Sequence, residues 1–164
     1  MQPFSFQRHL LSYAIVLSMI QLLITNDLLS EVKRVRGQTI YVPIYSHIYH
    51  GDQDKHPFDL TATLSIRNTD PDTPISVTVI DYYDSNGKLL KNFQRTQSKI
   101  NPMGSTRVII QESDKSGGSG ANFIVQWESE KKVTEPLIES IMIGTKIQQG
   151  ISFTSRGQVI KEIE

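Results

Sequence analysis

The hydrophobic pattern of this chain changes near residue 30, and this change limits what the chain can fold into. Residues 10–29 are mostly apolar and contain neither Gly nor Pro. From Gly37 onward, short segments of alternating apolar and polar residues are separated by turn residues. A long apolar segment is typical of a signal or membrane-spanning helix, and short alternating segments are typical of β-strands. The sequence therefore predicts one N-terminal hydrophobic helix followed by a β domain.

The boundary between the two parts is expected near Gly37, with a signal-anchor and juxtamembrane linker over residues 1–36 and the β domain over residues 37–164. No A-x-A-like cleavage site follows Ile24, which favours an uncleaved anchor, residues 10–29, over a cleaved signal peptide. A buried helix of a soluble protein is the alternative. The anchor interpretation predicts a domain tethered to a membrane.

The charges around the apolar segment conflict with export of the domain. Arg8 precedes the segment, whereas Lys33, Arg34 and Arg36 follow it. Because positive charges favour the cytoplasmic side, this rule alone would keep the β domain in the cytoplasm. A hydrophobic leader before a β domain favours export instead, so the orientation stays open at this point.

Composition excludes several classes of function. The chain has no Cys, which rules out disulfides, thiolate catalysis, Cys-type zinc sites and a lipid-modified N-terminal Cys. Lys and Arg together number 17, as do Asp and Glu, so no net charge favours binding to nucleic acid. We therefore expect no nucleic-acid partner.

The β domain shows seven or eight short strands at spacings of roughly 8–12 residues, which is typical of an all-β, immunoglobulin-like β-sandwich. Residues 58–68 alternate most clearly, and Asn86-Gly87 predicts a tight hairpin. Trp127 is expected between the sheets. Pro43 makes residues 39–49 either an edge strand or two short strands with a bend.

The sequence also makes specific predictions for a strand, a loop and a hairpin in the β domain. In residues 75–83, Ile75, Val77 and Val79 are expected on one face and Ile80 and Tyr82 on the other, which predicts a strand partly covered on both faces. Residues 113–121 (SDKSGGSGA) are rich in Gly and Ser and predict a flexible loop. Residues 144–157 are expected to form a hairpin.

Three histidines lie close together in the sequence: His47, His50 and His56. Neutral imidazole is a common ligand for zinc, copper and nickel, so these residues form a candidate metal site. Residues three apart on a strand point to opposite faces, so a shared metal requires a turn near Gly51. Ordinary surface histidines are the alternative.

No catalytic arrangement is present: a G-x-S-x-G elbow is absent, and Asp81 and Asp84 simply end a strand. We therefore expect a binding or interaction module without catalysis and without a cofactor. The loops 49–57 and 113–121 are the expected contact regions for a protein or small-ligand partner. The candidate binding residues in and beside these loops are His50, Asp52, Ser116, Gly118 and Asn122.

Several long motifs resemble a bacterial family known as domain of unknown function 3124. They are YVPIYSHIYHG (41–51), LTATLSIRNTD (60–70), YYDSNGKLL (82–90), NPMGSTRVII (101–110), SGGSGANFIVQW (116–127) and EPLIESIMIGTKIQQGISFTSRG (135–157). The resemblance implies one β domain behind an export or anchor segment. Together with the hydrophobic leader, this leads us to expect the domain at a bacterial cell membrane, on its extracytoplasmic, periplasmic side. It implies no activity and no site residues. The order of segments is also similar to the sensory-rhodopsin transducer family, which adds a homo-oligomer as an alternative.

Overall fold

The structure is a computed structural model that describes residues 32–50, 53–93, 97–146 and 148–163. The side chains of residues 50 and 53–56 are not part of this description. The predicted anchor, residues 10–29, also lies outside the described residues. From Lys33 onward the chain forms one compact unit.

Across the described ranges, no helix has both the length and the apolar character needed to cross a membrane.

The described part of the chain is all-β and contains no helix, as the alternating segments predict. Twelve strands are present within it, more than the seven or eight expected. The strands are β1 (Arg34–Pro43), β2 (His47–His50), β3 (Gln53–Asp59), β4 (Thr61–Arg67), β5 (Ile75–Tyr83), β6 (Leu89–Asn92), β7 (Ser98–Ile100), β8 (Ser105–Ile110), β9 (Asn122–Thr134), β10 (Leu137–Lys146), β11 (Gln149–Arg156) and β12 (Gln158–Ile163). The additional strands include β7, of three residues, and β12.

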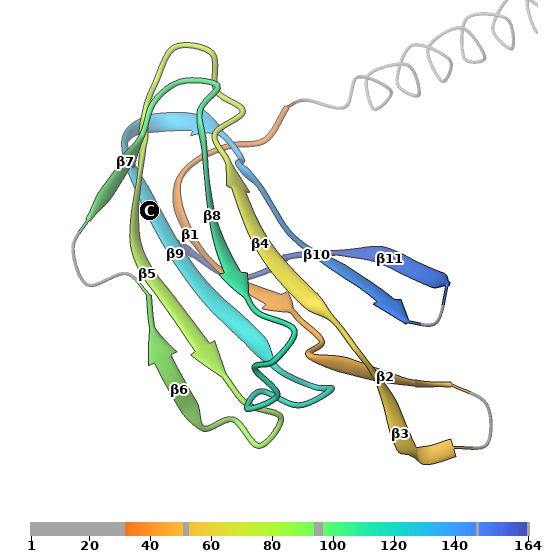
Figure 1. Cartoon of the computed structure of the whole chain (residues 1–164). Coiled ribbons are helices and arrows are strands. Elements are labelled where there is room, and N and C mark those ends of the chain that lie inside the picture. The colour runs from red at the N-terminus through yellow and green to blue at the C-terminus, as the bar shows by residue number, and fades with distance from the viewer. Residues whose placement is uncertain (1–31, 51–52, 94–96, 147, 164) are drawn as a thin grey trace, which may run out of the picture. The chain divides into compact units, whose positions relative to one another are not determined.

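The strands form three antiparallel sheets (Figure 1). The largest has the order β12-β1-β9-β5-β6, with β7 also paired to β5. The second has the order β11-β10-β4-β8, and β2 and β3 form a separate two-stranded ribbon. Buried apolar residues of the two larger sheets belong to one hydrophobic core. Burial of this shared core holds the two sheets together.

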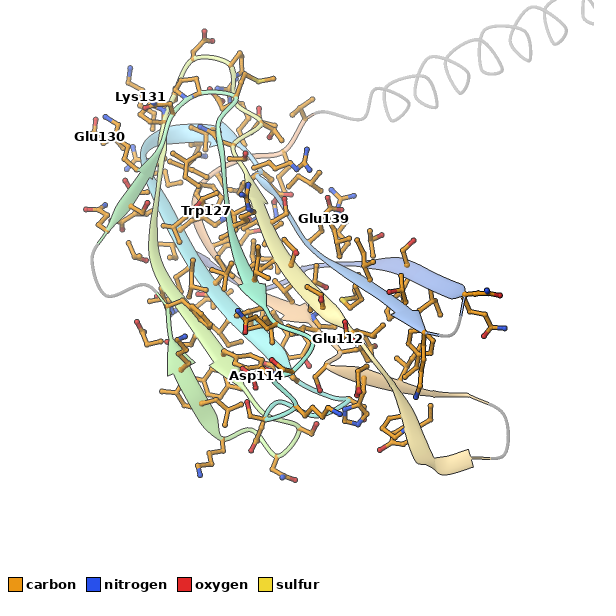
Figure 2. The ribbon with its side chains drawn as sticks, viewed as in Figure 1. Glu112, Asp114, Trp127, Glu130, Lys131 and Glu139 are labelled. Carbon is orange, nitrogen blue, oxygen red and sulfur yellow. The ribbon has the colours of Figure 1, made fainter. Side chains whose placement is uncertain are left out.

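The core contains the side chains that the alternating pattern predicts. On and just before β4, every second residue is fully buried: Leu60, Ala62, Leu64 and Ile66. Trp127 of β9 is also fully buried, which confirms its expected place in the core (Figure 2). Removal of a side chain of this size from water stabilises a fold by about 3 kcal/mol or more.

Strand β5 has one buried face and one half-buried face, in line with the partial cover expected on both, but a bulge decides which apolar residues are buried. Its pairing with β9 shifts register between Val77 and Val79, which marks a β-bulge. The extra residue changes the parity of the strand, so Val77, Ile80 and Tyr82 are all buried in the core. The apolar residues at both parities therefore reflect one buried face and a bulge.

Pro43 is the last residue of β1, and β2 begins four residues later at His47. The interpretation as two strands with a bend is therefore right, and the edge-strand alternative is wrong. Strand β1 lies inside the largest sheet, between β12 and β9. A proline is tolerated there because it stands at the end of the strand.

Strands β11 and β12 connect one edge of each large sheet. Only Gly157 separates them, and its backbone N–H donates a hydrogen bond to the Ile138 carbonyl at 2.9 Å. A Cβ at Gly157 would lie 2.6 Å from Cγ2 of Ile40, so a larger residue would not fit. Because Gly157 allows this close approach, the chain passes within one residue from β11, at the edge of the smaller sheet, to β12, at the edge of the larger one.

Candidate ligand-binding site

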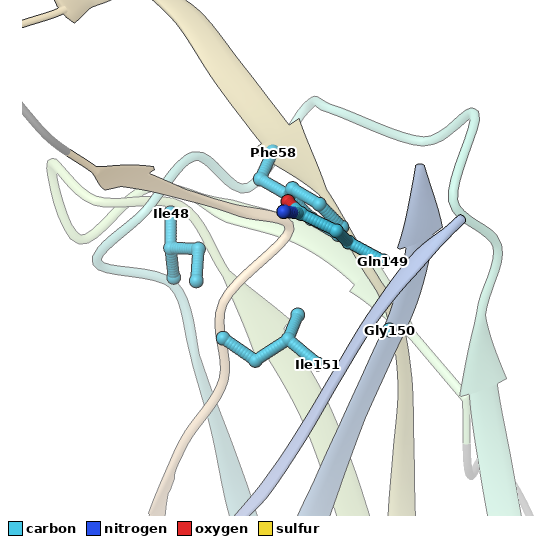
Figure 3. A pocket seen from close by; sticks show the side chains of 5 residues that line it. All are labelled: Ile48, Phe58, Gln149, Gly150 and Ile151. Carbon is cyan, nitrogen blue, oxygen red and sulfur yellow. The ribbon is translucent and has the colours of Figure 1, made fainter. Parts of the chain in front are cut away.

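An apolar pocket of about 350 Å³ lies between the β2–β3 ribbon and the β10–β11 hairpin (Figure 3). Its lining residues are Ile48, Phe58, Gln149, Gly150 and Ile151. None of these residues has a titratable side chain. The described lining therefore offers van der Waals contact and one side-chain amide, which suits binding of an apolar group.

The ribbon supplies the first wall of the pocket. Ile48 of β2 is paired with Phe58 of β3, and directly opposed residues of antiparallel strands project from the same face. Both side chains also pack against the main hydrophobic core. The core therefore holds this wall in place.

The hairpin supplies the second wall. Ile151 of β11 is paired with Gly144 of β10, so both are on the hairpin face toward the ribbon. A Cβ at Gly144 would lie 2.5 Å from the Asp59 carbonyl oxygen and 2.6 Å from Cε1 of Phe58. Gly144 thus allows the hairpin and the ribbon to approach closely. Ile151 remains 38% exposed, which leaves an apolar surface open to a ligand.

An aromatic contact continues this apolar surface along β11. Phe153 is two residues from Ile151 and therefore on the same face of the strand. Its ring meets the ring of Tyr45 edge to face, with centroids 5.7 Å apart. Tyr45 belongs to the segment between β1 and β2, so this contact connects the base of the ribbon to β11.

The candidate metal site gains no support from the structure. For His47, the Nδ1 atom lies 3.1 Å from the Ser46 hydroxyl oxygen and the Nε2 atom lies 3.2 Å from the Tyr49 hydroxyl oxygen. Both ring nitrogens are therefore within hydrogen-bond distance of a hydroxyl. The side chains of His50 and His56 lie outside the described residues. Among the residues that are described, no group of three or more metal-ligating side chains occurs.

The Gly-Ser loop, residues 113–121, makes many hydrogen bonds to neighbouring segments. The Gly118 carbonyl accepts hydrogen bonds from the backbone N–H and the hydroxyl of Ser46, at 3.2 and 2.9 Å. The Gly117 carbonyl accepts two from Ser85, both at 2.9 Å. The loop therefore acts as a structural connection between two distant turns, contrary to the flexible loop expected from its composition.

Other predicted binding residues occupy different places. The Ser116 hydroxyl donates to the Asp114 carboxylate, and Asn122 begins β9 with Pro43 and Tyr83 as its neighbours in the sheet. His50 ends β2, and Asp52 lies outside the described residues. Neither Ser116 nor Asn122 is among the described residues that line the pocket, and the side chain of His50 lies outside the description. Their role in binding stays a prediction.

Tyr82 lies under the same loop. Burial raises the pKa of its phenol to about 12, from an ordinary value of 10.0. Its ring contacts the Phe123 ring, with centroids 5.2 Å apart. The buried phenol is part of the core, and we assign it no chemical role.

The pocket residues were not identified from the sequence. Ile48 and Phe58 lie beside the loop 49–57, which was expected to contact a partner. In the sequence, however, they have the pattern of ordinary strand residues. Ile151 is far from them in sequence, and no local pattern indicates that β11 returns to the ribbon. The one sequence feature that could have indicated the pocket is the presence of apolar residues on both sides of that loop.

Comparison with known proteins identifies the family. A solved structure titled "Crystal Structure of Thermotoga maritima 1070" is similar with 13% sequence identity and a TM-score of 0.44, over 77% of this chain and 97% of that one. Among curated proteins, none matches this chain. The family described as Protein of unknown function (DUF3124) matches residues 37–160, which include every pocket residue. The chain therefore belongs to the DUF3124 family.

Proposed function

We propose that this protein is a non-catalytic binding module that is tethered to a bacterial membrane and takes an apolar group of its ligand into the pocket. One observation carries the proposal: Ile151 is 38% exposed beside Ile48 and Phe58, which line the same pocket. Contact with a ligand would remove this apolar surface from water, which favours binding. Among the described residues that line the pocket there is no acid, base or nucleophile, which supports binding without turnover.

The proposed anchor is the apolar segment, residues 10–29, with the β domain on the extracytoplasmic side. Two of the three cations that follow the apolar segment have ion-pair partners within the domain, which supports this orientation. Lys33 forms ion pairs with Glu135, at 3.0 Å, and with Glu162, and Arg34 forms one with Asp70 at 3.1 Å. These cations therefore have a role within the folded domain. Their presence after the apolar segment has an explanation other than membrane orientation.

Within this proposal the two large sheets form an immunoglobulin-like sandwich that presents the ribbon and the β10–β11 hairpin to the ligand. Two antiparallel sheets around one core with a buried Trp127 support that assignment. Sandwiches of this type commonly bind partners through loops and strands at one end.

The test uses a fluorescent apolar dye, 1-anilinonaphthalene-8-sulfonate, with the full-length protein in lipid nanodiscs. Ile151→Asp places a charge in the pocket and should weaken saturable dye binding at least about tenfold. Ile143→Asp is the matched control, because Ile143 is 51% exposed on the same hairpin but on the opposite face. Equal binding by wild type and Ile151→Asp, after subtraction of the empty nanodisc signal, would refute the proposal.

A further inference from the structure

We propose that the ligand is an extended peptide segment of a partner protein, which adds as a β-strand along the free edge of β11. This inference rests on the proposed function and specifies its ligand. In this arrangement one large apolar side chain of the peptide enters the pocket. The peptide backbone pairs with β11, and its side chain contacts Ile48, Phe58 and Ile151.

The first observation is the free edge itself. Among the residues that the structure describes, strand β11 is the last strand of its sheet and β10 is its one sheet neighbour. Its eight residues pair with β10 in an unbroken register from Gln149 to Arg156. In an antiparallel ladder, alternate residues direct their backbone N–H and C=O groups away from the paired strand. The outer edge of β11 therefore presents a regular row of donors and acceptors.

The second observation is that this edge lacks the features that commonly protect edge strands. The charged residue of β11, Arg156, is the last of the strand, so the run 149–154 contains no charge and no Pro, and no bulge interrupts it. In β8 and β12 the longest uncharged runs are shorter. The edge strand β12 differs, because it carries Lys161 and Glu162 and its register with β1 shifts between Thr39 and Ile40. The edge strand β8 carries Arg107. Of these three edges, β11 is the one open to addition of a strand.

The third observation is the position of the pocket relative to this edge. Gly144 and Ile151 are paired across β10 and β11, on the face toward the ribbon. In an added strand, the residue opposite Ile151 would lie in line with Gly144 and Ile151 and project from the same face. Its Cβ would be about 5 Å from the Cβ of Ile151. That face opens into the pocket lined by Ile48 and Phe58 (Figure 3). Backbone pairing and side-chain insertion are therefore compatible in one binding mode.

This combination favours a peptide over a free apolar small molecule. Backbone pairing supplies affinity, and a pocket for one side chain supplies specificity, as in other cases of strand addition. A small apolar molecule would fill the pocket and leave the β11 edge unpaired. A second copy of this chain would pair through its own β11, and self-association in the test below distinguishes that case.

The experiment measures binding of a fluorescein-labelled peptide to the full-length protein in nanodiscs by anisotropy. The probe is acetyl-Thr-Val-Thr-Leu-Thr-Val-Thr-Lys-amide, with Ser in place of Val and Leu in the control peptide. Two further forms are N-methylated, one at the Thr residues and one at Val and Leu. An added strand pairs through one of its edges, so one methylated form should lose at least about tenfold in affinity while the other binds like the parent.

Two further readouts complete the test. Amide hydrogen exchange should slow in residues 149–154 when the peptide binds, and Ile151→Asp should weaken binding whereas Ile143→Asp should not. Three results would overturn strand addition. The two methylated peptides bind with equal affinity, the parent peptide does not bind, or amide exchange in β11 slows only because the protein self-associates. Dye binding that remains in those cases leaves the proposed function intact. No saturable dye binding by the wild type, or equal binding by wild type and Ile151→Asp, refutes the proposed function itself.

Discussion

The guanidinium of Arg34, at the start of β1, donates a hydrogen bond of 3.1 Å to the fully buried carboxylate of Asp70. The same carboxylate accepts hydrogen bonds from the backbone N–H groups of Asp72, Thr73 and Thr134. It therefore connects the first strand, the turn after β4 and the end of β9. A buried carboxylate is stable only with such partners, because an unpaired charge is costly to remove from water.

Asp70→Asn should destabilise the domain by about 2 kcal/mol at neutral pH, because an amide replaces a carboxylate at a charged hydrogen-bond acceptor. The backbone N–H of Thr134, those of Asp72 and Thr73, and Arg34 lower the pKa of Asp70 below its ordinary 3.8. This stabilisation is therefore present above pH 3.8 and is lost as the pH falls toward the lower native pKa.

Urea unfolding at several pH values checks this prediction. The stability gap between wild type and Asp70→Asn should narrow on acidification below 3.8. Asp72→Asn, in the exposed part of the same turn, is the control. Its free energy of unfolding should stay close to that of the wild type. A gap for Asp70→Asn that does not depend on pH would contradict the assignment.

Tyr82 should make the domain less stable in alkali. Burial raises the pKa of its phenol to about 12 in the folded state, above the ordinary 10.0. The resulting stabilisation of the protonated phenol is fully present below pH 10.0 and is lost as the pH rises toward about 12. Near-ultraviolet absorbance should show one tyrosine that ionises late, and Tyr82→Phe should remove both that component and the alkaline loss. A Tyr82→Phe titration identical to that of wild type would contradict this prediction.

Gly117→Ala should destabilise the domain by about 2 kcal/mol through overpacking. A Cβ there would overlap the Tyr82 hydroxyl and lie 2.7 Å from Cζ of Tyr82 and 2.8 Å from Cβ of Ala121. Gly150→Ala is the matched control, because the nearest atom to its added Cβ is Cγ2 of Thr145 at 3.9 Å. Thermal unfolding of both variants measures the difference, and an unchanged midpoint for Gly117→Ala would show that the loop moves away without cost.

A tag at the C-terminus should be accessible to protease in intact spheroplasts, with Met1 or Gln2 retained as the N-terminal residue. This outcome follows from an uncleaved anchor, residues 10–29, and an extracytoplasmic domain. Disruption of the membrane is the control, since the tag must then be digested in either orientation. A tag that is protected until disruption would mean that Lys33, Arg34 and Arg36 keep the domain in the cytoplasm.

Local features of the fold were predictable from the chain. The burial of every second residue from Leu60 to Ile66 follows from a two-residue period, which depends on neighbouring residues alone. The Asn86-Gly87 turn is equally local: Gly87 has a φ of 78°, which glycine adopts without strain, and β5 pairs with β6 around it. The burial of Trp127 follows from its size and apolar character.

Long-range pairing was not predictable in the same way. The β5 bulge depends on the register with β9, and the order in the Gly-Ser loop depends on hydrogen bonds to Ser46 and Ser85. The pocket requires two segments distant in sequence, the ribbon with Ile48 and Phe58 and the hairpin residues 149–151, to meet at one place. A local hydrophobic period carries no information about which strand edges meet. That outcome depends on how both sheets bury a shared core, because core packing is a property of the whole chain.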